Sequence, residues 1–148
     1  MKSIFDKPTR EAIIARIKTL NEDSTPQWGK MNIYQMLKHC TLTEEMYLGD
    51  KIYPRQFIGR LLGRIALKSL TKDDAPMGKN APTSNDFKIK QTEGNVTELR
   101  DKWASLIERY HDFDNPNFTH WFFGKMTKEQ IGQLAYKHAD HHLKQFGA

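Results

Sequence analysis

The feature that most constrains the fold is a helical repeat, because apolar residues recur at three- and four-residue spacing in five segments. These segments span about residues 9–20, 32–49, 54–70, 95–110 and 127–146. No segment alternates apolar and polar residues long enough to predict a β-sheet, and only residues 87–90 alternate briefly. Two helices, one long crossover loop and two more helices are the outline of a four-helix bundle with one additional helix. The sequence therefore predicts an all-α fold.

Residues suited to helix caps lie at the ends of these segments. Asp6 precedes the first segment, and Asn32 and Gly49 begin and end the second. Thr127 with Gln130 forms a full capping box before the fifth. These signals mark where the predicted helices begin and end.

Length and composition predict a single domain over residues 1–148 that is soluble and cytoplasmic. Cys40 is the only cysteine, so an internal disulfide is excluded. The sequence lacks the apolar run of a signal peptide and the roughly 18 apolar residues of a membrane span. A formal charge of +5 is modest, and no nucleic-acid-binding motif is present. We expect neither nucleic acid nor a membrane as a partner.

The third segment has two interpretations. Its apolar residues share one side of a helix, with basic residues beside them, as in helices that lie on membranes or nucleic acid. Packing as an ordinary member of the bundle is the favoured interpretation. Gly59 and Gly63 would let a neighbouring segment approach closely. The residues in question are Phe57, Ile58, Leu61, Leu62 and Ile65 on the apolar side and Arg60, Arg64 and Lys68 beside them.

Residues 71–94 are rich in turn formers, Pro82 among them, and predict a long irregular crossover. Loops of this length often line binding sites. A surface connection between the two ends of the bundle is the favoured interpretation here.

The clearest indication of chemistry is a pair of histidines, His138 and His142, four residues apart in the fifth segment. Side chains at this spacing project from one face of a helix and could bind one divalent ion. Both fall within the apolar stripe of their helix, whereas His141 lies at its edge, roughly 80° from Ile131. Without a metal, each buried imidazole would need a backbone carbonyl or hydroxyl as a partner.

A third ligand must come from another part of the chain. The candidates are His39, His111, His120, Cys40 or a carboxylate, and His39 is the best by type and position because it lies within an apolar helix. A lone buried cysteine such as Cys40 is usually a small core residue. The histidine pair alone leaves the choice open.

Two stretches resemble the signature segments of the DinB-like superfamily. Trp28 followed by residues 31–39, MNIYQMLKH, resembles its second helix, and residues 138–145, HADHHLKQ, resemble its last. Residues 120–127, HWFFGKMT, narrow the resemblance to the DUF1569 subfamily, although Trp121 stands where proline is expected. The resemblance implies an up-and-down four-helix bundle with a divalent metal, zinc or nickel, bound by three histidines. Those positions are His39, His138 and His142 here.

The resemblance also implies a thiol-dependent transferase or a hydrolase that acts on a small molecule, because related members use a low-molecular-weight thiol. It further suggests a homodimer. We expect His120, His141 and Gln145 to line the pocket or to support the ligands, with a loop-anchoring hydrogen bond as the alternative for His120. The alternative function is a non-catalytic binding or scaffold protein whose metal site is vestigial or unoccupied. Four other side chains receive structural interpretations: Glu44 and Asp140 as solvated helix charges, Phe122 and Phe123 as core.

Overall fold

The computed structural model describes residues 1–81 and 83–148, and this part of the chain is mostly helical. Its elements are α1 (Lys7–Thr19), α2 (Ile33–Leu48), α3 (Phe57–Leu70), α4 (Val96–Glu108) and α5 (Lys128–Gln145), the 3-10 helices η1 (Asn85–Phe87) and η2 (Arg109–Asp112), and the strands β1 (Thr119–His120) and β2 (Gly124–Lys125). The prediction of a helical fold is confirmed. The antiparallel β1–β2 hairpin was not predicted, because two residues per strand are too few to show an alternating pattern.

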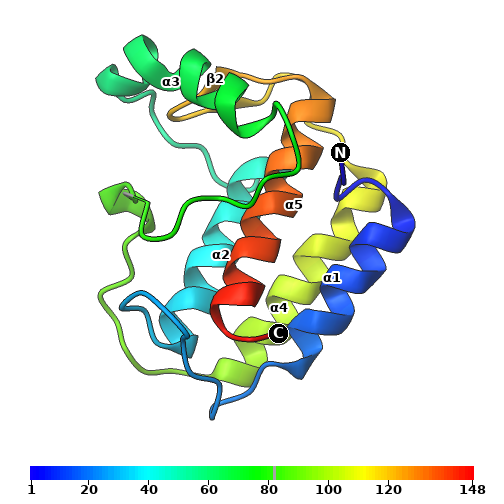
Figure 1. Cartoon of the computed structure of the whole chain (residues 1–148), viewed down its shortest axis with the longest axis vertical. Coiled ribbons are helices and arrows are strands. Elements are labelled where there is room, and N and C mark those ends of the chain that lie inside the picture. Colours follow the sequence, from blue (N-terminus) through cyan, green and yellow to red (C-terminus); the bar gives the residue numbers. More distant parts are fainter. Residues whose placement is uncertain (82) are drawn as a thin grey trace.

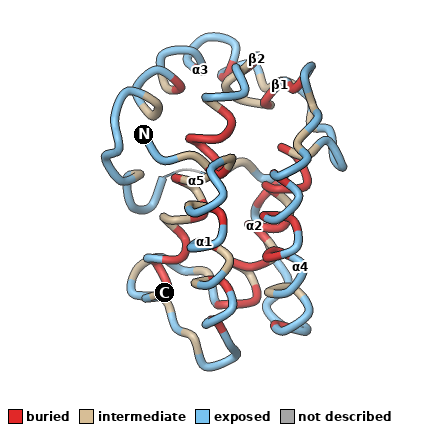
Figure 2. Tube along the Cα trace, turned by 90° about the vertical axis from the view of Figure 1, so that its right-hand side faces the viewer, coloured by how far each residue is buried: buried red, intermediate tan, exposed pale blue. Residues whose placement is uncertain are grey.

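Four of the helices, α1, α2, α4 and α5, lie alongside one another and hold most of the buried residues (Figures 1 and 2). α2 and α1 both pack against α4 and against α5. Fully buried side chains from all four meet in one core, which includes Ile17, Leu37, Trp103, Ile107 and Leu143. This packing places one face of α2 directly against α5, where the histidines lie.

The predicted caps are found at both helices that carry histidines. Asn32 and Gln35 form a capping box at α2, and Thr127 and Gln130 form one at α5. Gly49 ends α2 with a φ of 87°, a left-handed conformation that glycine adopts without a steric penalty. Asp6 occupies the N-cap position of α1, but its side chain makes no capping hydrogen bond.

Helix α3 does not pack as a member of this group, and the favoured sequence interpretation is wrong on that point. It lies across one end of the molecule and packs against the β1–β2 hairpin (Figure 1). Gly59, Gly63 and Leu67 are its buried residues, whereas its five large apolar residues before Ala66 are exposed. The predicted close approach at the two glycines is confirmed, since a Cβ on either would collide with the backbone of Phe122. The helix also begins at Phe57 rather than near Pro54.

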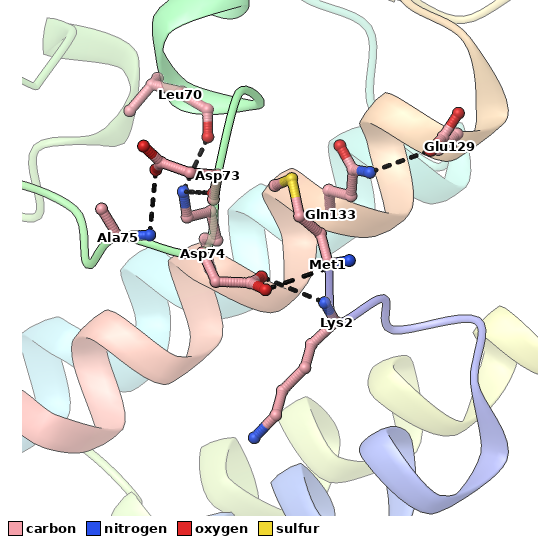
Figure 3. A network of polar contacts seen from close by, with 9 residues as sticks. Met1, Lys2, Leu70, Asp73, Asp74, Ala75, Glu129 and Gln133 are labelled. Atoms are coloured by element: carbon pink, nitrogen blue, oxygen red, sulfur yellow. Dashed lines mark hydrogen bonds and ion pairs between the residues drawn. The ribbon is translucent and has the colours of Figure 1, made fainter.

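The crossover after α3 is held against both the N-terminus and α5. The Asp74 carboxylate accepts a hydrogen bond of 3.2 Å from the backbone N–H of Lys2 and lies 4.0 Å from the N-terminal amine (Figure 3). Lys137 of α5 donates to the carbonyl oxygens of Leu70 and Asp73, each at 2.8 Å. Pro82, one of the turn formers in the predicted loop, lies outside the described residues. No helix in the described chain is both long and apolar enough to cross a bilayer.

Candidate metal centre

Three histidines from α2 and α5 meet at the seam between these helices. His39 comes from the middle of α2, and His138 and His142 come from successive turns of α5. One ring nitrogen from each lies within 4.8 Å of the others, and the Nε2 atoms of His39 and His138 are 3.1 Å apart. We call these three residues the histidine cluster.

Hydrogen bonds fix which nitrogen of His39 can bind an ion. Its Nδ1 lies 3.0 Å from the carbonyl oxygen of Phe87, which can only accept. Nδ1 therefore carries the proton, and the lone pair of Nε2 points into the cluster.

His142 is oriented in the same way by a side chain. Gln145 donates through Nε2 to the carbonyl oxygen of Trp28 at 2.8 Å, which leaves its Oε1 to face His142 Nδ1, also at 2.8 Å. Because an amide oxygen only accepts, His142 Nδ1 is protonated and its Nε2 is free. Partners of this kind commonly orient histidines that bind metals.

His138 is the member without such a partner. Its Nδ1 is buried and finds no hydrogen-bond partner among the described residues. Its Nε2 faces His39 Nε2, which carries no proton because the ring proton of His39 is on Nδ1. In a hydrogen bond between the two nitrogens, His138 Nε2 is therefore the donor. A buried polar nitrogen without a partner is unfavourable, so hydrogen bonding alone does not explain why His138 Nδ1 is buried here.

Burial keeps the cluster uncharged near neutral pH. It lowers the pKa of His142 to about 3, and it lowers the pKa of His39 and of His138, since a buried imidazolium loses its water. The carbonyl of Phe87 raises the pKa of His39 again, but less than burial lowers it. Neutral imidazole is the form that binds a metal ion.

The arrangement fits a divalent ion. Two nitrogens bound to one tetrahedral zinc ion lie about 3.3–3.4 Å apart, because each Zn–N bond is about 2.0–2.1 Å. The 3.1 Å between His39 and His138 is close to this value, and the 4.8 Å limit requires only small side-chain shifts. Three imidazoles suit zinc or nickel by donor type. The cluster could therefore hold a metal ion.

A family model described as a protein of unknown function, DUF1569, matches residues 5–148. The chain belongs to the DUF1569 family. No curated protein and no solved structure matches it.

Two of the other candidate ligands of this DUF1569 chain lie outside the cluster. Cys40 is fully buried, with its Sγ 3.6 Å from the sulfur of Met36, which confirms a core role. Burial and the nearby Glu44 raise the pKa of its thiol, so it resists forming the thiolate that binds metals. His111 is exposed in η2, with 69% of its side chain accessible.

His120 anchors the hairpin. It is buried, and its Nδ1 accepts hydrogen bonds from the backbone N–H groups of Phe122 at 3.0 Å and Phe123 at 3.2 Å. Because Nδ1 accepts both hydrogen bonds it carries no proton, so the ring proton of neutral His120 is on Nε2. Burial, with a contribution from Arg55, lowers the pKa of His120 to about 3. These contacts support the alternative in which His120 anchors the loop through hydrogen bonds. Phe122 and Phe123 are both half-buried, and Phe123 packs against the edge of the core.

His141 lies between the cluster and a surface pocket. Its ring is 5.1 Å from that of His142 and 5.8 Å from that of Trp28, edge to face in both cases. The pocket has a volume of about 460 Å³ and is lined by Trp28, Met77, Lys79, His141 and Lys144, among others. The Lys79 ammonium lies 4.3 Å from the centre of the Trp28 ring. Pockets of this size suit small molecules.

The environments of two carboxylates, Glu44 and Asp140, differ from the sequence prediction that both are solvated helix charges. Glu44 is fully buried in the core, where the Tyr110 hydroxyl donates a short hydrogen bond to its Oε2. Asp140 is only 13% exposed and lies 2.7 Å from both Arg16 and Lys144. The error arose because partners distant in the sequence, Tyr110 and Arg16, decide the environment of each carboxylate.

Sequence reasoning missed two backbone groups that orient the cluster. The carbonyl oxygens of Phe87 and Trp28 hold His39 directly and His142 through Gln145. The crossover is thus more than a surface connection, since Phe87 is buried against α2. Trp121 packs on Phe87, with ring centres 5.8 Å apart, which links the hairpin to this support. The sequence signal that could have indicated this support is Phe87, an aromatic residue within a polar loop.

Proposed function

We propose that this protein is a DinB-like metalloenzyme that binds one divalent metal ion, zinc or nickel, through His39, His138 and His142. The observation that carries the proposal is the convergence of three neutral imidazoles, two of them oriented with Nε2 inward. The side-by-side packing of α1, α2, α4 and α5 supports the up-and-down four-helix bundle of that superfamily.

The proposed reaction is a thiol-dependent transfer, or a hydrolysis, on a small molecule. A divalent ion on three imidazoles keeps an open position and lowers the pKa of a bound thiol or water there. The chain's own residues would orient the ligands and bind the substrate. The Phe87 carbonyl and Gln145 hold two imidazoles in place, and these two imidazoles, of His39 and His142, are buried. The pocket beside His141 is the proposed place for the substrate.

Metal content tests this proposal. Protein expressed without a histidine tag should bind about one equivalent of zinc or nickel at neutral pH, measured by titration against a chromophoric chelator. His138→Ala should abolish binding, whereas His111→Ala, at an exposed histidine, should leave it unchanged. Absence of binding by the unmodified chain at neutral pH would falsify the metalloenzyme proposal.

Activity requires a second experiment. The metal-loaded protein should be tested against a panel of low-molecular-weight thiols with electrophilic substrates, and against hydrolysable esters and amides. Turnover that depends on both metal and thiol supports the transferase, and turnover without thiol supports the hydrolase. A metal-loaded protein that turns over nothing in either panel contradicts the enzymatic half of the proposal.

The alternative is a non-catalytic binding or scaffold protein, and one contact favours it. The 3.1 Å contact between His39 and His138 is a satisfactory hydrogen bond without any ion. In that case chelator-treated protein should keep its full stability, and His138→Ala should destabilise it. A homodimeric state and a cytoplasmic location stay predictions from the sequence.

A further inference from the structure

The exposed apolar side chains of this protein are concentrated in one segment. Among the described residues, six of the seven large hydrophobic side chains that are exposed lie between residues 52 and 65. Phe57 is 76% exposed, Leu61 64% and Ile65 71%, and all three lie on the outward side of α3. Exposed apolar residues scattered singly need no explanation, but a contiguous patch indicates a binding surface. We call the patch on α3, formed by Phe57, Ile58, Leu61, Leu62 and Ile65, the α3 face.

The fold holds the α3 face outward. The inner side of α3 presents Gly59 and Gly63, which allow close contact with the backbone of Phe122. The N-terminal end is fixed by a hydrogen bond of 3.0 Å from Gln56 N–H to the Trp121 carbonyl oxygen. The C-terminal end is fixed by Lys137, which donates to Leu70 O. Turning the apolar side inward would break all of these contacts.

The charge beside the α3 face is of one sign. Residues 51–72 contain six lysines and arginines and no aspartate or glutamate. Arg60, Arg64 and Lys68 are exposed along one edge of the face, and none pairs with a carboxylate in the part of the chain that the structure describes. Arg64 donates only to the carbonyl oxygen of Lys125, at 3.0 Å. An apolar helix face edged by unpaired cations is complementary to an anionic bilayer surface.

A second copy of the chain fits this face less well. The outward side of a 14-residue helix is about 21 Å long and 10–12 Å wide, roughly 200–250 Å². A stable protein interface needs roughly 800 Å² from each partner. Antiparallel pairing of two α3 helices about a two-fold axis would also place both basic edges on the same side, where they repel. A bilayer sets no minimum interface area, since the strength of interfacial binding scales with the apolar area buried plus the attraction of cations to anionic lipids.

We propose that α3 is an interfacial anchor that binds the protein reversibly to anionic lipid surfaces, with its apolar face inserted and Arg60, Arg64 and Lys68 at the headgroups. This proposal reverses the expectation from sequence that no membrane is a partner. It is independent of the proposed enzymatic function. It concerns attachment to one leaflet and requires no membrane-spanning helix.

Co-sedimentation of the full chain with vesicles tests the proposal. The protein should bind phosphatidylcholine vesicles that contain phosphatidylglycerol at least about tenfold more tightly than pure phosphatidylcholine vesicles, and high salt should remove the difference. Arg60→Gln/Arg64→Gln and Leu61→Gln/Ile65→Gln should each lose binding. Lys18→Gln/Lys30→Gln removes the same charge from two exposed lysines, in the segment from the end of α1 to the start of α2, which lies at the end of the molecule away from α3 (Figure 1). This variant should bind as the unmodified chain does. Circular dichroism verifies that each variant is folded.

The other outcomes overturn the proposal. Equal binding to both kinds of vesicle, or binding unaffected by Arg60→Gln/Arg64→Gln, contradicts the electrostatic component. A dimer in light scattering that Leu61→Gln/Ile65→Gln abolishes, with no vesicle binding, shows that a second copy covers the face. Salt-sensitive binding to duplex DNA that survives Leu61→Gln/Ile65→Gln, again without vesicle binding, shows a nucleic-acid contact instead. A monomer that binds none of these also refutes it.

Discussion

Helix α2 carries two buried polar groups that respond to burial in opposite ways. On the side facing α5, burial lowers the pKa of His39 and its partners, so the histidine cluster stays neutral with free lone pairs. In contact with α4 and η2, burial raises the pKa of Glu44 to about 7, and the hydrogen bond from Tyr110 lowers it less. Burial disfavours the charged form of both groups, but only the neutral imidazole remains a good metal ligand. Burial thus produces a candidate binding site in one place and a structural contact in the other.

The largest expected effect is on stability, from Glu44→Ala. The variant removes a fully buried side chain and leaves the Tyr110 hydroxyl without its acceptor, so we expect a loss of about 3 kcal/mol in the free energy of unfolding. Urea denaturation measures this loss. Metal affinity should not change, since Glu44 contributes no atom to the cluster. A loss of metal binding in a folded Glu44→Ala protein would break the distinction between the two groups.

The next effect concerns metal affinity. Gln145→Ala removes the acceptor that fixes the His142 tautomer, and we expect zinc to bind about 10- to 100-fold more weakly. Chelator competition measures it. Gln133→Ala is the matched control, because Gln133 is also a buried glutamine of α5 but bonds only to Glu129. Equal affinities for the two variants would show that orientation of His142 is unimportant.

The third test uses the opposite pH responses. The pKa of Glu44 is about 7 in the folded chain and near its ordinary 4.5 when unfolded, so the folded state holds the extra proton. Its contribution is therefore fully present below about pH 4.5 and is lost as pH rises towards 7, with a slope of at most about 1.4 kcal/mol per pH unit. Glu44→Gln should remove this component from metal-free protein. The lowered pKa values of the histidines act in the opposite direction, so stability from them is lost as pH falls below 6.5.

The measurement is the difference in stability between the Glu44→Gln variant and the unmodified chain at each pH. Urea midpoints for the two proteins should converge near pH 4.5 and separate as pH rises to 7, with the Gln variant less affected by the rise. Parallel curves over this range would show that the folded pKa of Glu44 is ordinary.

The helices and the histidine pair on α5 were predictable because local signals decide them. A capping box at Thr127 begins α5, and its 3.6-residue period places His138 and His142 on one face. His39 needed the family resemblance, since no local signal says which segment packs against α5.

What failed depended on partners distant in the sequence. Periodicity predicts that the apolar side of α3 faces inward, yet the glycine side packs, because the backbone of Phe122 can approach closely there. Glu44 looked like a surface charge until Tyr110, 66 residues away in sequence, supplied its hydrogen bond. The carbonyl of Phe87 reaches His39 across 48 residues for the same reason. Periodicity identifies a helix face but does not identify what covers it.

The smallest expected effect separates His141 from its neighbour His142. His141 is half-buried, contributes no nitrogen to the cluster, and touches His142 only ring to ring. His141→Ala should therefore change zinc affinity by no more than about twofold, equivalent to about 0.5 kcal/mol. It should instead affect the binding of small molecules in the adjoining pocket, which isothermal titration of a turnover substrate or its analogue would detect. A large loss of zinc affinity would mean that the cluster extends to His141, and that α5 supplies three ligands rather than two.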